Sequence, residues 1–357
     1  MTRLRHFAGS PPERVVVLDD ARARLKGVVV LHSSRLGPAA GGCRFWRYPN
    51  MAALHFDALR LAEGMSYKNA LAGLPLGGGK AVLALPDGPF DRTRLFEAVG
   101  RAVADLGGNY VMAEGVGTTI ADMSAVRRTT DHVAGLPAMP GRAGGDPSPW
   151  TARGVFRAME VAAHYRFGCK LEGLTVAVQG LGNVGTHLCA LLHRAGVRLI
   201  LAEPRPGVAD ALAARYDAAI LPPDQIVGAR ADIFAPCALG GILDTSAIAA
   251  LRAKLVCGAA NNVLATPEDG DRLADRGILY APDYVVNAGG IINVAAEYLG
   301  WDLAEVERRV EATGTRLERV LASAWDEGVA PSRAADQMAR RMIRDSPVRA
   351  GRSLLWA

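Results

Sequence analysis

The chain has 357 residues, 50% of them hydrophobic and 22% charged, which is typical of a globular protein long enough for two domains. The net charge is +5, but the basic residues are dispersed and form no tract, which argues against a nucleic-acid partner. No apolar run reaches roughly 18 residues and no apolar signal segment opens the chain, so we expect no membrane association and a cytoplasmic protein. The five cysteines lie far apart without a C-x-x-C pair, which favours reduced thiols and predicts no metal site.

The first part of the chain alternates between strand-like and helix-like segments, which is an α/β pattern. The expected strands are Arg14–Leu18, Gly27–His32, Ala81–Leu85 and Asn109–Ala113, and the expected helices are Met51–Ala72 and Phe90–Leu106. A stretch rich in glycine and proline, from Leu136 to Pro149, is typical of a connection between domains. We therefore place a first domain at residues 1–147.

The second part of the chain repeats the alternation. We expect a helix at Thr151–Tyr165, a buried strand at Thr175–Gln179, and further strands and helices to about Tyr284. Charged, amphipathic segments between Leu303 and Arg344 predict helices. We expect a second α/β domain at residues 148–329 and a cleft between the two domains, where small-molecule sites tend to form. The C-terminal helices, at about 330–357, are expected to pack back on the first domain.

A glycine motif follows the buried strand of the second domain. Residues 180–185 read G-L-G-N-V-G and directly precede an apolar helix pattern. In this setting Gly180 permits a tight turn, Gly182 lets the backbone approach a diphosphate, and Gly185 lets the helix pack closely on the strand. The motif therefore predicts a Rossmann dinucleotide-binding domain.

The choice of dinucleotide depends on the residues around this motif. Asn183 and Val184, the first residues of the helix, would offer free N–H groups to the diphosphate. Glu203 ends the next strand, where a carboxylate accepts hydrogen bonds from the adenosine ribose and disfavours a 2′-phosphate. Arg205 would instead suit such a phosphate, so NADP stays an alternative. We predict NAD as the cofactor.

Two lysines, Lys68 and Lys80, lie in the stretch M-S-Y-K-N-A-L-A-G-L-P-L-G-G-G-K-A-V. Only five of the 41 basic residues are lysine, so each lysine is a candidate for chemistry. The stretch is not a phosphate-binding P-loop, because Leu74 and Ala81 replace its first glycine and its Ser or Thr. Lys80 begins an apolar strand, where burial and a second ammonium lower a lysine pKa towards that of a general base. Lys68 would stay charged and hold a substrate carboxylate.

Six motifs, in this order, resemble those of the glutamate, leucine, valine and phenylalanine dehydrogenase superfamily, and most closely its leucine, valine and phenylalanine branch. They are L-G-P-A-A-G-G-C-R-F-W at 36–46, the lysine stretch at 65–82, G-D-P-S-P-W-T-A at 145–152, G-L-G-N-V-G at 180–185, C-G-A-A-N-N at 257–262 and N-A-G-G-I-I-N-V at 287–294. The resemblance covers nearly the whole chain. It implies a homo-oligomer that converts an L-amino acid to its 2-keto acid and ammonia, or the reverse, with NAD. It also implies that the first domain, at residues 1–147, is a substrate-binding and oligomerisation domain.

The resemblance also implies roles for single positions. Lys68 would bind the substrate carboxylate, and Lys80 would activate the attacking water. The other implied substrate-binding positions are Ala40, Gly41, Met65, Ala113, Asn262, Ile291 and Val294. The implied cofactor-binding positions, besides the glycine motif and Glu203, are Thr151, Cys237, Ala238 and Asn261.

The sequence departs from this family at two positions. The family motif reads approximately A-E-D-V-G-T-T, and its aspartate moves protons to and from the substrate nitrogen, whereas this chain has Gly115 there. Loss of such a group lowers a rate by about a hundred- to ten-thousand-fold, unless Glu114, an ordered water or the substrate replaces it. Ala40 replaces a bulkier aliphatic residue, which favours a bulky or aromatic substrate side chain.

Two hypotheses about function follow from these observations. The first is an active enzyme on a hydrophobic amino acid, or a specialised imine or amino acid reductase of a biosynthetic pathway. The second is a non-catalytic NAD-binding regulatory subunit, which Gly115 alone supports. The presence of Lys68, Lys80, Asn261 and Asn262 favours the enzyme, because a regulator has no chemical reason to keep them.

Overall fold

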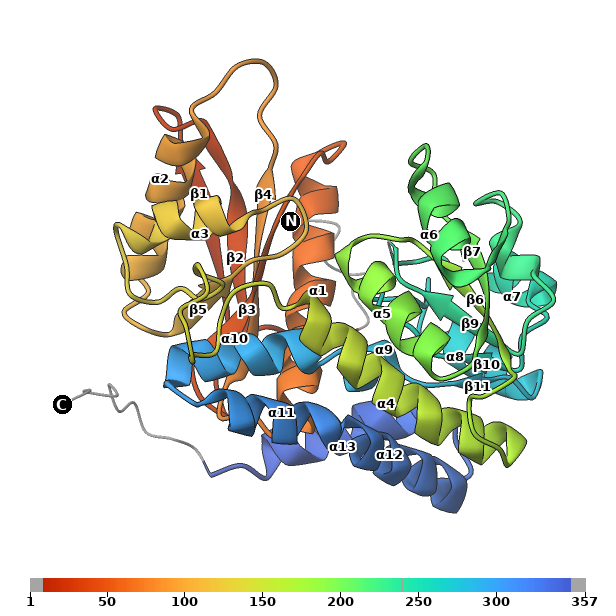
Figure 1. Ribbon diagram of the computed structural model, residues 1–357. Helices are drawn as coiled ribbons and strands as arrows, with labels where there is room; N and C mark the ends of the chain where they lie inside the picture. The colour runs from red at the N-terminus through yellow and green to blue at the C-terminus, as the bar shows by residue number, and fades with distance from the viewer. Residues whose placement is uncertain (1–8, 239, 348–357) are drawn as a thin grey trace. The chain divides into compact units, whose positions relative to one another are not determined.

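The computed structural model describes residues 9–238 and 240–347, which form two compact units (Figure 1). Unit 1 contains the described residues up to Asp146, residues 293–306 and the residues from Ala339 onward. Unit 2 contains Pro147–Ile292 and Glu307–Met338. The first division lies next to the predicted boundary at 147. Residues 293–306 were predicted in the second domain but belong to unit 1, and residues 330–338 were predicted to pack on the first domain but belong to unit 2.

These differences fall in helices that contain residues of both units. In helix α10 (Gly289–Leu299), Glu297 accepts hydrogen bonds from the backbone N–H groups of Gly135 and Leu136, at 2.8 and 3.0 Å, which ties the end of the helix to unit 1. In helix α13 (Pro331–Arg344), Arg333 Nη2 donates to Oδ2 of Asp271 at 2.8 Å within unit 2, whereas Arg340 Nε donates to the hydroxyl of Tyr67 at 2.8 Å within unit 1. A helical pattern in a sequence does not reveal that its two ends pack in different units.

Unit 1 is built on a five-stranded sheet with the order β1-β2-β4-β3-β5. Its elements are β1 (Arg14–Asp20), β2 (Leu25–Ser33), β3 (Ala39–Trp46), α1 (Met51–Leu71), β4 (Gly77–Ala84), α2 (Arg92–Ala104), β5 (Tyr110–Ala113) and α3 (Ile120–Arg127). Strands β1 and β2 are antiparallel, and β3 is parallel to both β4 and β5. All the strands and helices predicted for this part of the chain occur. The structure also contains β3 and α3, which were not predicted.

The two faces of this sheet are covered by different helices. Helix α1 contributes Leu54 and Ala58 to a core cluster with Val30 of β2 and Val82 of β4. Helices α2 and α3 pack on the other face in a larger cluster that contains Ala81 of β4. Because neighbouring strand residues point to opposite faces, these two clusters fix the direction of each β4 side chain.

The triple glycine of β4 allows α1 to lie very close to the sheet. A Cβ atom on Gly78 would lie 2.1 Å from the backbone nitrogen of Ser66 in α1, and one on Gly77 would lie 2.0 Å from the carbonyl oxygen of Ser33. Helix α1 begins at Asn50, whose side chain accepts a hydrogen bond from the Ala53 N–H group and caps the helix. The close approach brings the last turns of α1 against the start of β4, where Lys80 follows the glycines.

Unit 2 contains a six-stranded parallel sheet with the order β11-β10-β9-β6-β7-β8. Its elements up to the last strand are α4 (Ser148–Phe167), β6 (Thr175–Gln179), α5 (Asn183–Arg194), β7 (Arg198–Ala202), α6 (Val208–Tyr216), β8 (Ala219–Ile220), η2 (Ile226–Gly228), β9 (Ile233–Pro236), α7 (Thr245–Ala250), β10 (Leu255–Val256), α8 (Glu268–Asp275) and β11 (Leu279–Tyr280). The order places β6, which precedes the glycine motif, at the centre of the sheet. This is the Rossmann-type arrangement that the motif predicts.

The chain ends in helices, as the charged amphipathic pattern predicts. They are α9 (Asp283–Val286), α10, α11 (Leu303–Glu311), α12 (Thr313–Glu327) and α13. Arg153 and Arg157 of α4 both bind the carboxylate of Glu311, which fixes the last turn of α11 to α4 in unit 2. Among the helices of the described chain, none combines the length and the hydropathy of a membrane span.

Candidate active site

Lys80 and Lys68 come from facing elements of unit 1. Lys80 pairs with Val30 in the sheet, and Val30 belongs to the cluster covered by α1, so Lys80 points towards α1. Lys68 lies in the last turn of α1 and is only 8% exposed. The fold therefore places both lysines between α1 and the same face of the sheet.

The surroundings of Lys80 strongly favour its neutral form. Desolvation by the surrounding protein lowers the pKa of Lys80 to about 7, and the positive charges of Arg44 and Lys68 contribute to this lowering. Cys43 and Asp57 act in the opposite direction and do not outweigh these effects. At neutral pH a large share of the Lys80 amines can therefore accept a proton, as a general base must.

Gly41 approaches this group of residues closely. A Cβ atom on Gly41 would lie 2.0 Å from the carbonyl oxygen of Gly79 and 3.1 Å from Cγ of Met65 in α1. The hydroxyl of Tyr110 donates to the Gly41 carbonyl at 2.8 Å and fixes the strand there. Ala40 and Ala113 lie on β3 and β5 and are almost fully buried. Unit 1 thus brings Gly41, Met65 and the glycines before Lys80 together.

Arg44 is part of this site, although the sequence analysis assigned it no role within the motif at 36–46. It lies on β3 in register with Val82 of β4, on the α1 side of the sheet. Its Nη1 atom donates to Oδ2 of Asp57 in α1 at 2.9 Å, and the Tyr48 hydroxyl donates to the same oxygen. The alternation along β3 is the signal that would have revealed it, but β3 is glycine-rich and was not predicted as a strand.

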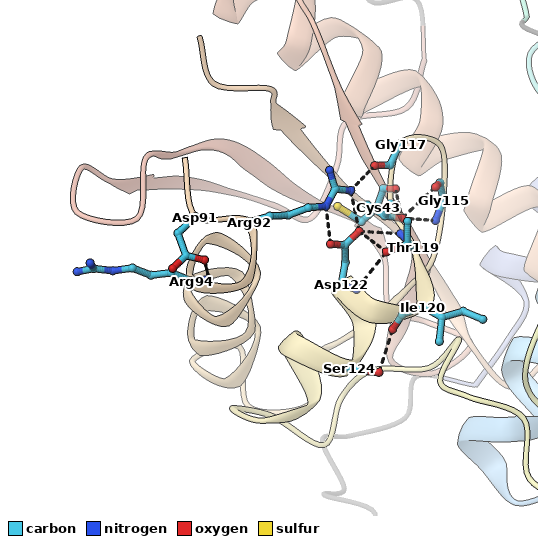
Figure 2. A network of polar contacts seen from close by, with 11 residues as sticks. Cys43, Asp91, Arg92, Arg94, Gly115, Gly117, Thr119, Ile120, Asp122 and Ser124 are labelled. Carbon is cyan, nitrogen blue, oxygen red and sulfur yellow. Dashed lines mark hydrogen bonds and ion pairs between the residues drawn. The ribbon is translucent and has the colours of Figure 1, made fainter. Parts of the chain in front are cut away.

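Gly115 lies in a tightly bonded turn, shown in Figure 2. Its N–H group donates to Oγ1 of Thr118 at 2.8 Å, and its carbonyl accepts from the same hydroxyl at 2.9 Å. Arg92 stabilises the turn through a bidentate ion pair, in which Nε and Nη2 donate to the two carboxylate oxygens of Asp122 at 2.7 and 2.8 Å. Nη2 also donates to the carbonyl of Gly117 at 2.8 Å.

The turn leaves no room for a side chain at position 115. A Cβ atom on Gly115 would lie 2.4 Å from the carbonyl oxygen of Cys43 on β3, far inside van der Waals contact. Backbone therefore occupies the direction in which any side chain at position 115 would begin.

Glu114 points to the other side of the sheet from Lys80. A Cβ atom placed on Gly135 would lie 3.3 Å from the Glu114 Cβ and 3.7 Å from Cγ of Met123, which belongs to the α2 and α3 cluster. Desolvation and the nearby carboxylates of Asp146 and Asp122 raise the pKa of Glu114. A carboxyl group on that face is badly placed to replace the missing acid near Lys80.

The glycine motif of unit 2 has the geometry of a diphosphate cradle. Gly180 has a φ of 92°, which favours glycine, and a Cβ on Gly185 would lie 2.1 Å from the Gly180 carbonyl oxygen. A Cβ on Gly182, in contrast, would meet nothing within 4 Å, so packing within the protein does not require this glycine. Helix α5 begins at Asn183 without a side-chain cap, and its first N–H groups can face an anion. These residues fit a dinucleotide.

Glu203 and Arg205 are bound to the glycine turn. The Leu181 N–H group donates to Oε2 of Glu203 at 2.8 Å, and Arg205 Nε donates to Oε1 at 2.7 Å. Arg205 Nη2 also donates to the Leu181 carbonyl at 3.1 Å. The hydrogen bond from Arg205 is the main cause of a lowered Glu203 pKa, so the carboxylate is ionised at neutral pH. The backbone N–H group of Arg205 also donates to Oε1, at 3.2 Å, so Oε2 is the oxygen that can still accept a hydrogen bond from a ribose hydroxyl.

The other predicted cofactor positions lie in loops of unit 2. Ala238 contacts the glycine turn, because a Cβ on Gly180 would lie 2.8 Å from the Ala238 Cβ. The Cys237 N–H group donates to the Gln179 carbonyl at 2.7 Å. Thr151, in the first turn of α4, donates its hydroxyl to the Pro147 carbonyl at 3.0 Å. Cys237 and Ala238 are thus brought to the glycine motif.

The asparagine pair forms a strained turn. Asn262 has a φ of 52°, and Asn261 Oδ1 accepts a hydrogen bond from Asn287 Nδ2 at 3.0 Å. Of the two predicted pocket residues in α10, Ile291 belongs to unit 2 and Val294 to unit 1, and both are nearly buried. The predicted residues are therefore divided between the two units. Within the described part of the chain, no cluster of three or more potential ligands could hold a metal ion.

Comparison with known families agrees with this two-part arrangement. The profile of the Glu/Leu/Phe/Val dehydrogenase dimerisation domain matches residues 13–132. The profile described as Glutamate/Leucine/Phenylalanine/Valine dehydrogenase matches residues 146–209 and 201–346. The chain belongs to the Glu/Leu/Phe/Val dehydrogenase family. This family membership confirms the resemblance of the six motifs and gives unit 1 the dimerisation domain of the family.

Similar proteins of the Glu/Leu/Phe/Val dehydrogenase family include a leucine dehydrogenase from Geobacillus stearothermophilus, which is 44% identical over 332 residues. The aligned residues cover 93% of this chain and 90% of that protein. A valine dehydrogenase from Streptomyces albus is 43% identical over 94% of this chain and 93% of its own length. The crystal structure of L-tryptophan dehydrogenase from Nostoc punctiforme is 37% identical, with a TM-score of 0.78 and coverage of 94% and 96%. All three relatives are amino acid dehydrogenases.

Proposed function

We propose that this protein is an NAD-dependent dehydrogenase of a hydrophobic L-amino acid, acting in oxidative deamination to the 2-keto acid and ammonia or in the reverse direction. One observation carries the proposal: Lys80, with its pKa lowered to about 7, lies beside the buried Lys68 between α1 and the sheet. A site without chemistry would have no reason to keep a buried lysine whose surroundings disfavour its charged form, next to a second buried lysine. The leucine, valine and tryptophan dehydrogenases among its relatives support the same substrate class.

In this proposal each lysine has its own task. Lys68 holds the substrate carboxylate by charge, and Lys80 accepts a proton from the water that attacks the substrate carbon. NAD, when bound, supplies the acceptor for the hydride. In unit 2 the glycine motif and the start of α5 hold its diphosphate, and Glu203 accepts from its ribose hydroxyls. Low solvent access around Lys68 strengthens its attraction for the carboxylate.

The missing acid at position 115 bears on the proton route. The Gly115 turn is closed against Cys43, and Glu114 points to the opposite face of the sheet. Lys80, whose pKa of about 7 allows it both to accept and to release a proton at neutral pH, is therefore the group we assign to proton transfer at the substrate nitrogen as well. We expect slower turnover than with a dedicated acid, by about a hundred-fold or more.

The substrate side chain is inferred from the small residues around Gly41. Ala40 and Ala113 are both almost fully buried, and Met65 lies within contact distance of the Gly41 backbone. Small side chains at such positions enlarge an apolar pocket and favour a bulky or aromatic substrate side chain by about 1–3 kcal/mol. The tryptophan dehydrogenase among its relatives is an example of such a substrate.

A screen in both directions tests the proposed function. Hydrophobic L-amino acids are offered with NAD or NADP, and the matching 2-keto acids are offered with ammonia and NADH or NADPH, while the reduced cofactor is followed by its absorbance. We expect turnover with NAD and at least one bulky amino acid, and loss of activity in Lys80→Met. No turnover in either direction would contradict the proposal.

Two alternatives have specific observations behind them. A reductase of a preformed imine needs no acid to release ammonia, which suits the closed turn at Gly115; it predicts activity with cyclic imines and none with keto acids and ammonia. A non-catalytic NAD-binding subunit predicts that calorimetry detects NAD binding but no amino or keto acid binding. Binding of a keto acid that is lost in Lys68→Met would exclude this second alternative.

We also propose a cytoplasmic homo-oligomer. The five cysteines are all free thiols, which suits a reducing compartment. The edge strand β1 of the dimerisation domain leaves Val15 and Val17 exposed by 45% and 64%, as expected of a strand that another copy covers. Light scattering coupled to size-exclusion chromatography measures the assembly, and a monomer at micromolar concentration would contradict the homo-oligomer.

A further inference from the structure

We propose that Arg44, held by Asp57 and Tyr48, is a positioning residue of the candidate active site that acts on Lys80 through its fixed positive charge. This inference deepens the proposed function and rests on the role of Lys80 in it. It concerns a residue for which neither the glycine motif nor the lysine motif provides an explanation.

The sheet places Arg44 next to Lys80. Arg44 pairs with Val82 in the parallel register of β3 and β4, and Lys80 precedes Val82 by two residues on the same face. Arg44 and Lys80 are therefore diagonal neighbours on the face that α1 covers. The Arg44 side chain is 20% exposed, so water weakens its field less than at the surface.

Two side chains hold the guanidinium of Arg44 in place. Its Nη1 atom donates to Asp57 Oδ2 at 2.9 Å, and Asp57 is itself only 25% exposed. The Tyr48 hydroxyl donates to the same Asp57 oxygen. A carboxylate that accepts from both a guanidinium and a phenol is strongly tied to those two donors, and it keeps the arginine in one position beside the sheet.

Among the charged groups around Lys80, Arg44 has the largest effect on the Lys80 pKa. Helix α1 contributes the ammonium of Lys68 and the carboxylate of Asp57, and β3 contributes Arg44 and the thiol of Cys43. Burial raises the pKa of Cys43 to about 12, so this thiol is uncharged at neutral pH. Strand β2 places the apolar Val30 opposite Lys80. After desolvation, Arg44 has the largest effect on Lys80, ahead of Lys68.

The titration of the Lys80 amine itself tests this inference. Purified protein is exposed briefly to acetic anhydride between about pH 5.5 and 9, and mass spectrometry of the Lys80 peptide gives the rate of acetylation at each pH. Only the neutral amine reacts. We expect half-maximal reactivity near pH 7 in the natural protein and a midpoint about 0.5–1 pH unit higher in Arg44→Gln, which keeps a donor for Asp57 but removes the charge.

Two further variants separate charge from structure. Arg44→Lys keeps a positive charge, and we expect its midpoint to stay near that of the natural protein. Arg47→Gln is the matched control, because Arg47 forms an exposed ion pair with Asp87 at 2.8 Å and we expect no shift there. An unchanged midpoint in folded Arg44→Gln, or the same shift in Arg47→Gln, would overturn the inference.

A second measurement serves if Arg44→Gln does not fold. Asp57→Asn removes the carboxylate that Arg44→Gln would leave without its ion pair, so Arg44→Gln is added to Asp57→Asn and the two proteins are compared. We expect a higher midpoint in the double variant than in Asp57→Asn alone, and equal midpoints would count against Arg44. Because acetylation needs no turnover, a failed substrate screen with a normal Arg44 effect would contradict only the proposed function, and active enzyme without an Arg44 effect would contradict only this inference.

Discussion

At the scale of single residues, Lys80 shows a conflict between stability and chemistry. Its pKa falls from 10.5 in an unfolded chain to about 7 in the folded protein. Between these two values the unfolded chain binds more protons, so the free energy of unfolding rises with pH over this window. Below pH 7 the cost of burying the amine is fully present and amounts to at most about 5 kcal/mol.

We therefore predict that Lys80→Met stabilises the protein while it abolishes activity. The free energy of unfolding should rise by about 2–4 kcal/mol at pH 7, because an apolar side chain of similar length replaces a buried amine. The gain should shrink towards pH 10.5, the unfolded-chain pKa of the lysine. Denaturant unfolding at several pH values measures it.

Lys26→Met is the matched control for this prediction. Lys26 is an exposed lysine on β2 of the same sheet, so its replacement should change the free energy of unfolding by less than about 0.5 kcal/mol. A Lys80→Met protein that is less stable than the natural one at pH 7 would show that the amine makes compensating interactions.

Gly115 supports a second prediction, about the turn that replaces the acid. A Cβ atom there would lie 2.4 Å from the Cys43 carbonyl oxygen, so Gly115→Ala should lower the free energy of unfolding by about 1–3 kcal/mol. Gly115→Asp carries the same clash and adds a carboxylate. Judged from the sequence, Gly115→Asp simply restores an acid at this position. The structure predicts that it also strains the Gly115 turn, which Arg92 and Asp122 hold.

The comparison of these two variants isolates the carboxylate. At equal loss of stability, we expect Gly115→Asp to deaminate at least about tenfold faster than Gly115→Ala. Thermal unfolding and steady-state rates measure the two effects separately. Unchanged stability in Gly115→Ala would contradict the close approach, and equal rates in the two variants would mean that proton transfer does not pass through this position.

At the scale of elements, the sequence predicts what repeats along the chain and misses what depends on packing. Helix α1 and the strand before the glycine motif carry regular apolar patterns, and both occur close to their predicted bounds. Strand β3 reads A-A-G-G-C-R-F-W and has weak strand propensity; it forms because β4 and β5 pair with it on both sides. Because β3 was missed, so was the position of Arg44.

The candidate site shows the same division. Lys68 and Lys80 could be predicted because lysine is rare in this chain and because the surrounding motif is long. The direction of Glu114 and the closure of the Gly115 turn could not, since they depend on contacts with Gly135 and Cys43, which are distant in the sequence. The assignment of 293–306 to unit 1 and of 330–338 to unit 2 likewise depends on hydrogen bonds made by single residues, Glu297 in α10 and Arg333 in α13.

Helix α1 supports a third prediction, because its last turns carry both Met65 and Lys68. The hydroxyl of Tyr67 donates to Glu63 Oε1 at 2.8 Å and accepts from Arg340 Nε at 2.8 Å. Tyr67→Phe removes both bonds and leaves two charged groups less well satisfied. We expect a loss of about 1–3 kcal/mol in the free energy of unfolding and a higher KM for the amino acid with an unchanged KM for NAD.

Tyr165→Phe is the matched control for Tyr67→Phe, because Tyr165 lies on a different helix, α4, and is 50% exposed. Its stability and both KM values should stay near those of the natural protein. If Tyr67→Phe raises the KM of NAD as much as that of the amino acid, the hydroxyl does not act through the lysine end of α1.

At the scale of the whole molecule, the two units should respond differently to the cofactor. A ligand at about a hundred times its Kd stabilises the state that binds it by about 2.7 kcal/mol. The glycine motif, Glu203 and Arg205 all belong to unit 2. We therefore predict that NAD raises the melting temperature of unit 2 more than that of unit 1. Calorimetric scans, in which a protein of two units can show more than one transition, measure this difference.

The same scans decide between NAD and NADP. Glu203 is ionised and would repel a 2′-phosphate, whereas the exposed Arg205 could turn from Glu203 to such a phosphate. We expect a larger thermal shift with NAD than with NADP at equal concentration. Arg205→Ala should abolish the remaining shift with NADP and preserve the shift with NAD, because it removes the counter-charge proposed for the phosphate and leaves the ribose acceptor in place. A natural protein that NADP stabilises at least as well as NAD would contradict the assignment of Glu203.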